Sequence, residues 1–230
     1  MKRFTSWARS KTVTKVSSLT ETQTLCRLVV LISGSGSNLQ AIMDCCTDGT
    51  IPAKVVGVIS NQAQAYGLTR ARDAGIDAHC LDHRDFPSRD QYDAALMDLI
   101  ERLNPDLVVL AGFMRILGHD FVGKYLGRML NIHPSLLPLY PGLETHQRVL
   151  ADGAKEHGAS VHFVTAELDA GPVIIQGRTG ITKNDTPQTL AQRVHHIEHQ
   201  IYPQAIGWFA QGRLQLRSGK ALLDNQTITA

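Results

Sequence analysis

Asn131 and His133 stand two residues apart at the end of the stretch GRMLNIH, residues 127–133. In a β-strand, residues i and i+2 project from the same face, so the amide and the imidazole are predicted to point the same way. Pro134 disfavours helical geometry at His133 and therefore supports an extended end to the strand. An amide donor beside an imidazole could polarise a carbonyl and handle a proton; a purely structural histidine at a strand end is the alternative.

A carboxylate that could join this pair occurs in the segment ELDAGPVI, residues 167–174. Asp169 stands in a Gly/Pro turn between two apolar stretches, which is an exposed place for a charged side chain. A carboxylate beside His133 would favour the imidazolium form and fix the orientation of the ring. Separation along the sequence does not by itself bring the two together, so this grouping is predicted on chemical grounds.

The turn SGSGSN, residues 33–38, lies between a predicted strand and a predicted helix. Free N–H groups and the positive dipole end of that helix could hold an anion, and Gly34 and Gly36 allow its close approach. No Gly-Lys-Ser/Thr follows, as a Walker A loop requires, and Leu39 stands where a dinucleotide fingerprint has its third glycine. A phosphate monoester therefore fits better than NAD, with a plain strand-to-helix turn as the alternative.

Alternating strands and helices are predicted to position these residues. Short apolar runs rich in β-branched residues indicate buried strands, and apolar residues at helical spacing indicate the helices between them. Strands are expected at 28–33, 53–60, 77–81, 105–112 and 127–133, and helices at 37–46, 65–75, 88–103, 144–152 and 186–209. The runs 159–165 and 171–181 predict an antiparallel hairpin. The fold class is therefore α/β, with a mostly parallel, Rossmann-like sheet, antiparallel strands in the C-terminal half and helices on both faces.

The composition is that of an ordinary globular protein. The chain has 230 residues, of which 43% are hydrophobic and 19% charged, with a formal net charge of +2. This balance does not indicate a nucleic-acid or membrane partner, and no apolar run is long enough to span a bilayer. Cys26, Cys45, Cys46 and Cys80 form no C-x-x-C pattern and are predicted to be reduced thiols in a cytoplasmic protein.

The first 25 residues differ from the rest of the chain. They are rich in Lys, Arg, Ser and Thr, contain Glu21 as their one acid, and lack the apolar stretch of a secretory signal. We expect a disordered basic extension over residues 1–25, ahead of one folded domain over residues 26–230. An organelle transit peptide and a nucleic-acid-binding arm are the alternatives.

Four segments, taken in order, resemble the folate-dependent formyltransferases: LISGSGSNLQ, NPDLVVLAGFMRIL, LNIHPSLLPLYPG and SVHFVTAELDAGPVI. The resemblance runs from about Leu28 to Asp224 and implies the Rossmann-like formyltransferase fold. It also implies transfer of a formyl group from 10-formyltetrahydrofolate to the amine of glycinamide ribonucleotide, in purine synthesis. The YPG segment and the SGSGSN turn favour this acceptor over those of other branches of the family.

The resemblance assigns a catalytic role to each of the three polar residues. Asn131 would donate a hydrogen bond to the tetrahedral oxyanion, and His133, as imidazolium, would stabilise it and act as general acid. Asp169 would hold and charge His133 and help to move the amine's proton through water. No nucleophilic side chain is needed, so Ser135 is interpreted as a loop residue.

The same resemblance implies two binding regions. The ribonucleotide would contact Gly36, Ser37, Asn38, His195 and Glu198, with its phosphate on the first three. The folate would contact Arg89, Met114, Arg115, Ile116, Leu117, Asn131, Thr165, Ala166, Glu167, Leu168 and Asp169. His162 is expected near the site, whereas His79, His83, His119, His146 and His157 are interpreted as surface or loop residues.

Several alternatives concern the same residues. His195 and His199 are spaced i, i+4 in HHIEH, but no third metal ligand is evident, so no metal is expected. A non-catalytic phosphate-binding protein would use the glycine-rich turn and would not need Asn131, His133 and Asp169 together. Methionyl-tRNA formyltransferases carry a further C-terminal domain and formyltetrahydrofolate hydrolases an N-terminal regulatory domain; neither is expected here. The implied partners are the two small molecules, without nucleic acid or membrane, for a monomer or weak homodimer.

Overall fold

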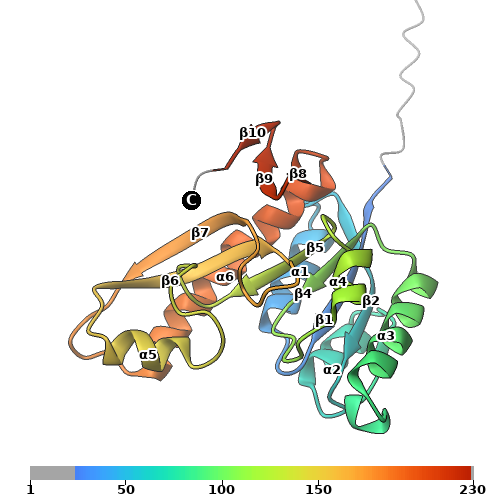
Figure 1. The fold of residues 1–230 in the computed structure, drawn as a ribbon, viewed down its shortest axis with the longest axis horizontal. Coiled ribbons are helices and arrows are strands. Elements are labelled where there is room, and N and C mark those ends of the chain that lie inside the picture. The colour runs from blue at the N-terminus through green and yellow to red at the C-terminus, as the bar shows by residue number, and fades with distance from the viewer. Residues whose placement is uncertain (1–23, 229–230) are drawn as a thin grey trace, which may run out of the picture.

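A seven-stranded sheet forms the centre of the computed structural model, which describes residues 24–228 (Figure 1). The predicted extension therefore lies outside the described residues, apart from its last two. Along the sheet the strands are β3 (Ala78–Cys80), β2 (Ala53–Ser60), β1 (Cys26–Ile32), β4 (Leu107–Leu110), β5 (Met129–His133), β6 (Glu156–Phe163) and β7 (Val173–Gly180). The pairs from β3 to β5 are parallel, and β5–β6 and β6–β7 are antiparallel. The predicted mixed sheet is confirmed.

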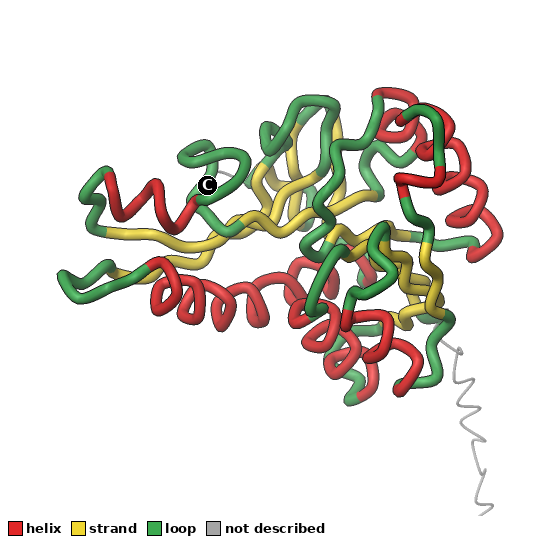
Figure 2. Tube along the Cα trace, turned by 90° about the horizontal axis from the view of Figure 1, so that it is seen from below, coloured by secondary structure: helices red, strands yellow, loops and turns green. Residues whose placement is uncertain are grey.

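Helices cover both faces of this sheet (Figure 2). They are α1 (Ser37–Thr47), α2 (Tyr66–Asp73), α3 (Arg89–Leu103), α4 (His119–Lys124), α5 (Thr145–Ala151) and α6 (Pro187–Ala210), with a short 3₁₀ helix η1 (His83–Asp85). Residues of α1, α2 and α6 share one apolar core, and residues of α3 and α4 share the other. Within residues 24–228, none of the helices combines the length and the apolar character needed to cross a membrane.

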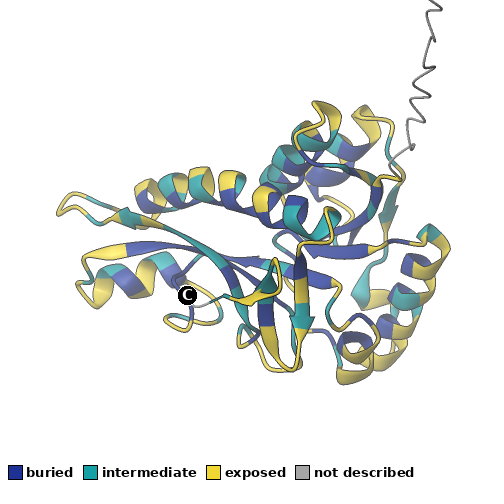
Figure 3. Ribbon diagram, turned by 90° about the horizontal axis from the view of Figure 1, so that it is seen from above, coloured by how far each residue is buried: buried dark blue, intermediate teal, exposed yellow. Residues whose placement is uncertain are grey.

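Strand β1 shows why both faces of the sheet must be covered. Leu28, Val30 and Ile32 belong to the core with α1 and α6, whereas Val29 and Leu31 belong to the core with α3. All five are completely buried, as the dark central strands of Figure 3 illustrate. Because successive side chains point to opposite faces, a strand buried on both faces has a continuous apolar sequence. The run LVVLI is such a sequence.

Helix α6 is fixed beneath β4 and β5 by Tyr202. Its hydroxyl lies 2.9 Å from the carbonyl oxygen of Leu110 and 3.0 Å from that of Leu130, and the two acceptors share its one proton. Burial raises the pKa of Tyr202 well above its usual value, so the phenol remains a neutral donor. This contact holds the helix that carries His195 and Glu198 against the strands that lead to the candidate site.

Three parts of the fold are absent from the sequence prediction. They are the 3₁₀ helix η1, helix α4 and a three-stranded antiparallel sheet of β8 (Leu214–Arg217), β9 (Lys220–Leu223) and β10 (Gln226–Thr227). Its strands are too short to show a clear alternation of apolar and polar residues. The turns between these strands contain Gly219, Asp224 and Asn225, residue types that favour tight two-residue hairpin turns, and all four turn residues, including Ser218, have positive φ.

Candidate active site

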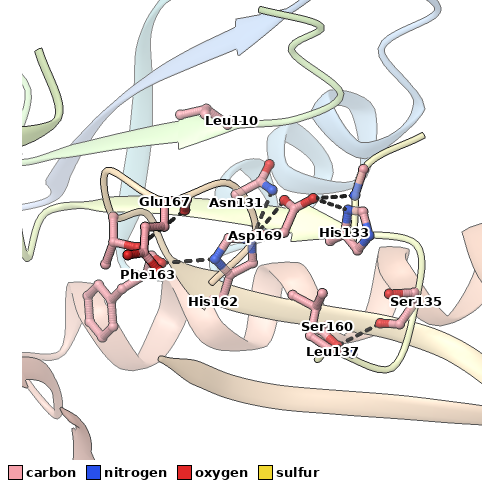
Figure 4. Close-up of polar contacts among 12 residues, drawn as sticks. Leu110, Asn131, His133, Ser135, Leu137, Ser160, His162, Phe163, Glu167 and Asp169 are labelled. Carbon is pink, nitrogen blue, oxygen red and sulfur yellow. Dashed lines mark hydrogen bonds and ion pairs between the residues drawn. The ribbon is translucent and has the colours of Figure 1, made fainter. Parts of the chain in front are cut away.

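Asn131, His133 and Asp169 meet at the carboxyl end of β5 (Figure 4). Nδ1 of His133 lies 3.4 Å from Oδ2 of Asp169, and both side chains are only 7% exposed. Because water is largely excluded, solvent screens this contact less than it would screen a surface ion pair. The structure therefore brings the three residues together as the sequence analysis expects, with Asp169 placed between two histidines in Figure 4.

Asp169 reaches this point from the turn between β6 and β7. Its φ of 52° lies in the left-handed region, which Asp adopts more readily than most residues. Besides facing His133, its Oδ2 accepts a hydrogen bond from the Gly142 N–H at 2.8 Å. Its Oδ1 lies 3.7 Å from Nε2 of His162. The carboxylate thus connects its own turn to the loop after β5 and to both histidines.

The second histidine, His162, stands directly opposite Asn131 in the β5–β6 ladder. Its Nδ1 lies 2.9 Å from the carbonyl of Phe163, which can only accept, so the hydrogen-bond pattern assigns the proton to Nδ1. Nε2 of the neutral ring then accepts from the Asn131 amide at 3.0 Å. Burial lowers the pKa of His162, which favours this neutral ring. The bond occupies one N–H of Asn131 and leaves the other for a ligand.

His133 is held through both ring nitrogens. Nε2 lies 2.8 Å from the carbonyl of Tyr140, so Nε2 carries a proton. Nδ1 is consequently the atom at which His133 can gain and lose a proton, and the carboxylate of Asp169 is placed to accept from it when it is protonated. The geometry provides an imidazole with one fixed tautomer beside a buried carboxylate, which is suited to proton transfer.

One cavity, of about 110 Å³, is lined by Asn131, His162 and Asp169. The rest of its lining is largely apolar and includes Leu110, Phe113, Ile116, Leu117, Val122, Val164 and Leu168. The turn between β6 and β7 closes it from one side. An apolar slot with a few convergent polar groups suits a flat heterocycle.

A second cavity, of about 290 Å³, is lined by the whole glycine-rich turn, residues 33–38. Helix α1 begins at Ser37, so the unpaired N–H groups of its first turn lie beside this cavity. Gly36 has a φ of 71°, and a Cβ there would lie 2.7 Å from the Cα of Gly67. A side chain at position 36 would therefore displace α2 or the turn.

Glu198 lies opposite the glycine-rich turn and is 4% exposed. Its Oε2 accepts a hydrogen bond from the Asn38 amide at 2.8 Å, while the Asn38 Oδ1 is buried without a protein partner. Burial raises the pKa of Glu198, because desolvation disfavours the charged form. His195, one turn earlier on α6, also lines the cavity. These groups give the cavity side-chain hydrogen-bonding capacity beside the N–H groups of the turn.

The structure groups most of the predicted binding residues as the sequence analysis expects. Gly36, Ser37, Asn38, His195 and Glu198 all line the larger cavity. The smaller cavity is lined by the predicted folate residues Arg115, Ile116, Leu117, Asn131, Thr165, Ala166, Glu167, Leu168 and Asp169. Met114 lines the larger cavity instead. Arg89 is exposed at the start of α3 and lines neither.

Of the five histidines interpreted as surface or loop residues, His146 and His157 contact each other inside the fold. His157 lies on β6 and is 1% exposed, and Nδ1 of His146, on α5, lies 3.1 Å from its Nε2. His146 also lines the larger cavity. Burial lowers the pKa of both rings, that of His157 to about 4. A hydrogen bond between these two nitrogens requires one of them to be unprotonated, so acid opposes this contact.

The His157 pKa predicts that the free energy of unfolding falls below pH 6.5. Between pH 6.5 and 4 the unfolded chain binds a proton at this position and the folded chain does not, so the stability present above pH 6.5 is lost as the pH falls. We expect a loss of about 2 kcal/mol from this residue between pH 7 and pH 5. Urea unfolding at both pH values measures it. His157→Asn should reduce the pH dependence, and an unchanged dependence would contradict the assignment.

The i, i+4 histidines of HHIEH form no metal centre with neighbouring side chains. The rings of His195 and His199 are nearly parallel, at 9°, with centroids 6.5 Å apart. In the part of the chain that the structure describes, no group of three or more His, Cys, Asp or Glu side chains is arranged to hold a metal ion. His195 is instead placed at the larger cavity.

Comparison with known proteins identifies the family of this chain. The family model described as formyl transferase matches residues 26–206, and the chain belongs to this family. Phosphoribosylglycinamide formyltransferase of Escherichia coli K12 is 54% identical over 201 residues, which cover 87% of this chain and 95% of that protein.

Solved structures lead to the same group of enzymes. The phosphoribosylglycinamide formyltransferase of Coxiella burnetii has a TM-score of 0.86 at 52% identity, covering 89% of this chain and 96% of that one. Glycinamide ribonucleotide transformylase 1 of Symbiobacterium toebii has a TM-score of 0.84 at 48% identity, covering 86% and 94%. The sequence resemblance to formyltransferases is thereby confirmed.

Proposed function

We propose that this enzyme is a phosphoribosylglycinamide formyltransferase, which transfers the formyl group of 10-formyltetrahydrofolate to the amine of glycinamide ribonucleotide in purine synthesis. The supporting observation is the position of β5 between the two cavities. Asn131 lines the smaller cavity, and the next residue, Ile132, lines the larger. Substrates bound in the two cavities would therefore meet at the end of one strand, beside His133 and Asp169.

We assign the ribonucleotide to the larger cavity. The glycine-rich turn and the first turn of α1 offer N–H groups to a phosphate dianion. Asn38, His195 and Glu198 offer hydrogen bonds to the sugar and the glycinamide end. The buried Asn38 Oδ1, which has no protein partner, supports a ligand donor at this position.

We assign the folate to the smaller cavity. Phe113, Ile116 and Leu117 offer an apolar wall for the flat pterin, and backbone groups of the 165–169 turn offer hydrogen bonds to its edge. This position brings N10 and its formyl group towards Asn131. Arg89 and Met114 lie outside this cavity. They could contact only a part of the folate that extends out of the cavity, away from the pterin.

The proposed transfer proceeds by direct attack. The amine nitrogen of the ribonucleotide forms a bond to the formyl carbon, and the carbonyl oxygen becomes an oxyanion. The free N–H of Asn131 donates to this oxygen, and protonated His133 adds positive charge beside it. The amine loses a proton, with Asp169 as the acceptor through water, and N10 gains one as its bond to carbon breaks. The products are the N-formyl ribonucleotide and tetrahydrofolate, and the scheme contains no metal step.

A non-catalytic phosphate-binding protein is the competing interpretation. Such a protein would use the glycine-rich turn and Glu198 to bind its ligand in the larger cavity. This interpretation offers no reason for Asn131, His133 and Asp169 to meet beside a second, largely apolar cavity. We further propose, from the sequence, that the enzyme acts in the cytoplasm as a monomer or weak homodimer.

The proposed function is tested by incubating the purified chain with both substrates. We expect tetrahydrofolate and the formylated ribonucleotide to appear in equal amounts, measured by absorbance and by mass spectrometry. Omitting either substrate should abolish product formation. Glycinamide ribonucleotide that binds without any transfer would support the phosphate-binding interpretation and exclude the proposed one.

A further inference from the structure

Ser33 lines the larger cavity and directly follows β1. Its backbone N–H donates to the carbonyl of Gly112 at 3.1 Å. Its hydroxyl accepts from the backbone N–H of Met114 at 2.8 Å and donates to Oδ1 of Asn61 at 2.5 Å. One serine therefore joins the first residue of the glycine-rich turn to the turn that follows β4.

Asn61 fixes the direction of the Ser33 hydroxyl. It follows β2 and is 1% exposed, so its side chain has little freedom to move. A hydroxyl has a single proton, and giving it to Asn61 leaves an oxygen lone pair for the Met114 N–H. Loss of the hydroxyl would leave the buried Asn61 oxygen without this donor, which is unfavourable.

The other side of the glycine-rich turn is already fixed. Gly67, on α2, donates its N–H to the carbonyl of Gly34 at 3.1 Å, and Arg70 Nε donates to the carbonyl of Ser35 at 2.9 Å. Gly36 packs directly on Gly67. The turn is therefore held by α2 on one side, and Ser33 provides its connection on the other.

The segment 112–117 contributes to both cavities. Gly112 and Met114 line the larger cavity, whereas Phe113, Arg115, Ile116 and Leu117 line the smaller one. A ligand that orders this segment in the smaller cavity thus also acts on a segment bonded to Ser33. Energetic coupling requires an element whose arrangement both ligands influence, and this segment lies where both ligands can contact it.

We propose that Ser33 is a positioning residue that couples the binding of the two substrates, through its hydrogen bonds to Met114 and Asn61. The inference rests on the proposed assignment of ribonucleotide and folate to the two cavities. Each ligand that favours the arrangement in which Ser33 accepts from the Met114 N–H stabilises the same arrangement of residues 112–117 for the other ligand. By linkage, each ligand increases the affinity for the other by the same factor.

Isothermal titration calorimetry tests the coupling. Glycinamide ribonucleotide is titrated into the protein alone and into the protein saturated with tetrahydrofolate, the product that carries no formyl group. We expect tetrahydrofolate to tighten ribonucleotide binding at least about fivefold in the natural protein. Ser33→Ala should bring this ratio close to one, and Ser33→Thr, which keeps the hydroxyl, should restore most of it.

Two further variants separate coupling from stability. Asn61→Ala removes the acceptor of the Ser33 proton and should also reduce the ratio, so the test survives if Ser33→Ala does not fold. Thr186→Ala removes a hydroxyl that likewise accepts a backbone N–H, from Thr189 at 3.2 Å, but lines neither cavity. Its ratio should equal that of the natural protein.

The outcomes distinguish this inference from the proposed function. A ratio of one in the natural protein, or an unchanged ratio in both folded variants at Ser33 and Asn61, overturns the coupling while leaving the transfer assay intact. Failure of the natural protein to bind either ligand overturns the assignment of the cavities. If Ser33 has a purely structural role, its substitution would weaken the binding of each ligand or lower the thermal stability. The ratio of ribonucleotide affinity with tetrahydrofolate to that without it would then stay unchanged.

Discussion

His133→Ala is expected to lower kcat for formyl transfer by roughly 10²- to 10⁴-fold, the range of general acid–base catalysis. In the proposed reaction, this imidazole supplies a positive charge beside the oxyanion and a proton for the departing nitrogen. Alanine provides neither. Nδ1 of His133 lies 3.4 Å from Asp169, and Nε2–H is bound to the Tyr140 carbonyl, so alanine removes an imidazole held in one orientation beside the carboxylate. Single-turnover measurements with both substrates would isolate the chemical step.

The fold should tolerate this substitution. His133 lies at the end of β5, and its removal leaves the Tyr140 carbonyl without one donor, at a cost of about 1–3 kcal/mol. Far-UV circular dichroism and thermal melting would verify folding. His133→Gln keeps an N–H donor for that carbonyl but cannot transfer protons, so it should be nearly as inactive as the alanine variant.

His196→Ala provides the matched control. This histidine is exposed on α6, contacts Gln200 and lines neither cavity, so kcat should stay within about twofold of the natural value. The KM values of the His133 variants should change much less than kcat, because the two cavities remain. A folded His133→Ala enzyme with more than a tenth of the natural kcat would remove His133 from the mechanism.

The central sheet could be predicted because a strand that is buried on both faces has a continuous apolar sequence. LVVLIS and AKVVGVIS are continuous apolar runs, and the predicted strand at 53–60 coincides with β2. The helix predicted over residues 88–103 coincides with α3 and its N-cap Ser88, whose hydroxyl accepts from the Gln91 N–H. Helix α4 and the sheet β8–β10 are too short for periodicity to become distinct from chance, and for the sheet the turn residues are the better signal.

The pairing of Asn131 and His133 followed from strand periodicity, but their surroundings did not. The partnership of Asn131 with His162 depends on the register of β5 against β6, and a long connection separates these strands. The Tyr140 carbonyl is a backbone group, so side-chain identity gives no indication of its role. Asp169 was grouped with His133 on chemical grounds and by family resemblance; its distance from the ring is a property of the folded turn.

Hydrogen bonds between loops are likewise invisible to sequence patterns. Ser33 was part of the recognised SGSGSN turn, yet its bond to the Met114 N–H depends on β1 and β4 being neighbours. The arrangement of strands in the sheet decides which turns meet at its carboxyl edge. Sequence periodicity predicts each strand separately and leaves the lateral order of the strands open. The sequence can therefore identify candidate residues of the site, whereas their contacts with one another require the structure.

Asn131→Ala is expected to lower kcat by roughly 10²- to 10³-fold, the usual effect of removing one oxyanion donor. One N–H of the Asn131 amide is bound to Nε2 of His162, which fixes the amide plane, and the other is available at the smaller cavity. The hydrogen bond from this preoriented N–H is much stronger to the charged oxygen of the transition state than to the neutral formyl oxygen of the substrate. The substitution should therefore reduce kcat and kcat/KM to a similar extent and leave both KM values nearly unchanged.

Asn131→Asp distinguishes hydrogen-bond donation from shape. The carboxylate has almost the size of the amide, but it cannot donate when ionised, and its charge opposes the oxyanion. It should therefore be no more active than the alanine variant, whereas a residue needed only to fill space would retain activity as Asp. Asn184→Ala, in an exposed turn, is the control and should leave kcat unchanged. If Asn131→Asp were close to the natural enzyme, oxyanion stabilisation would have to come from His133 alone.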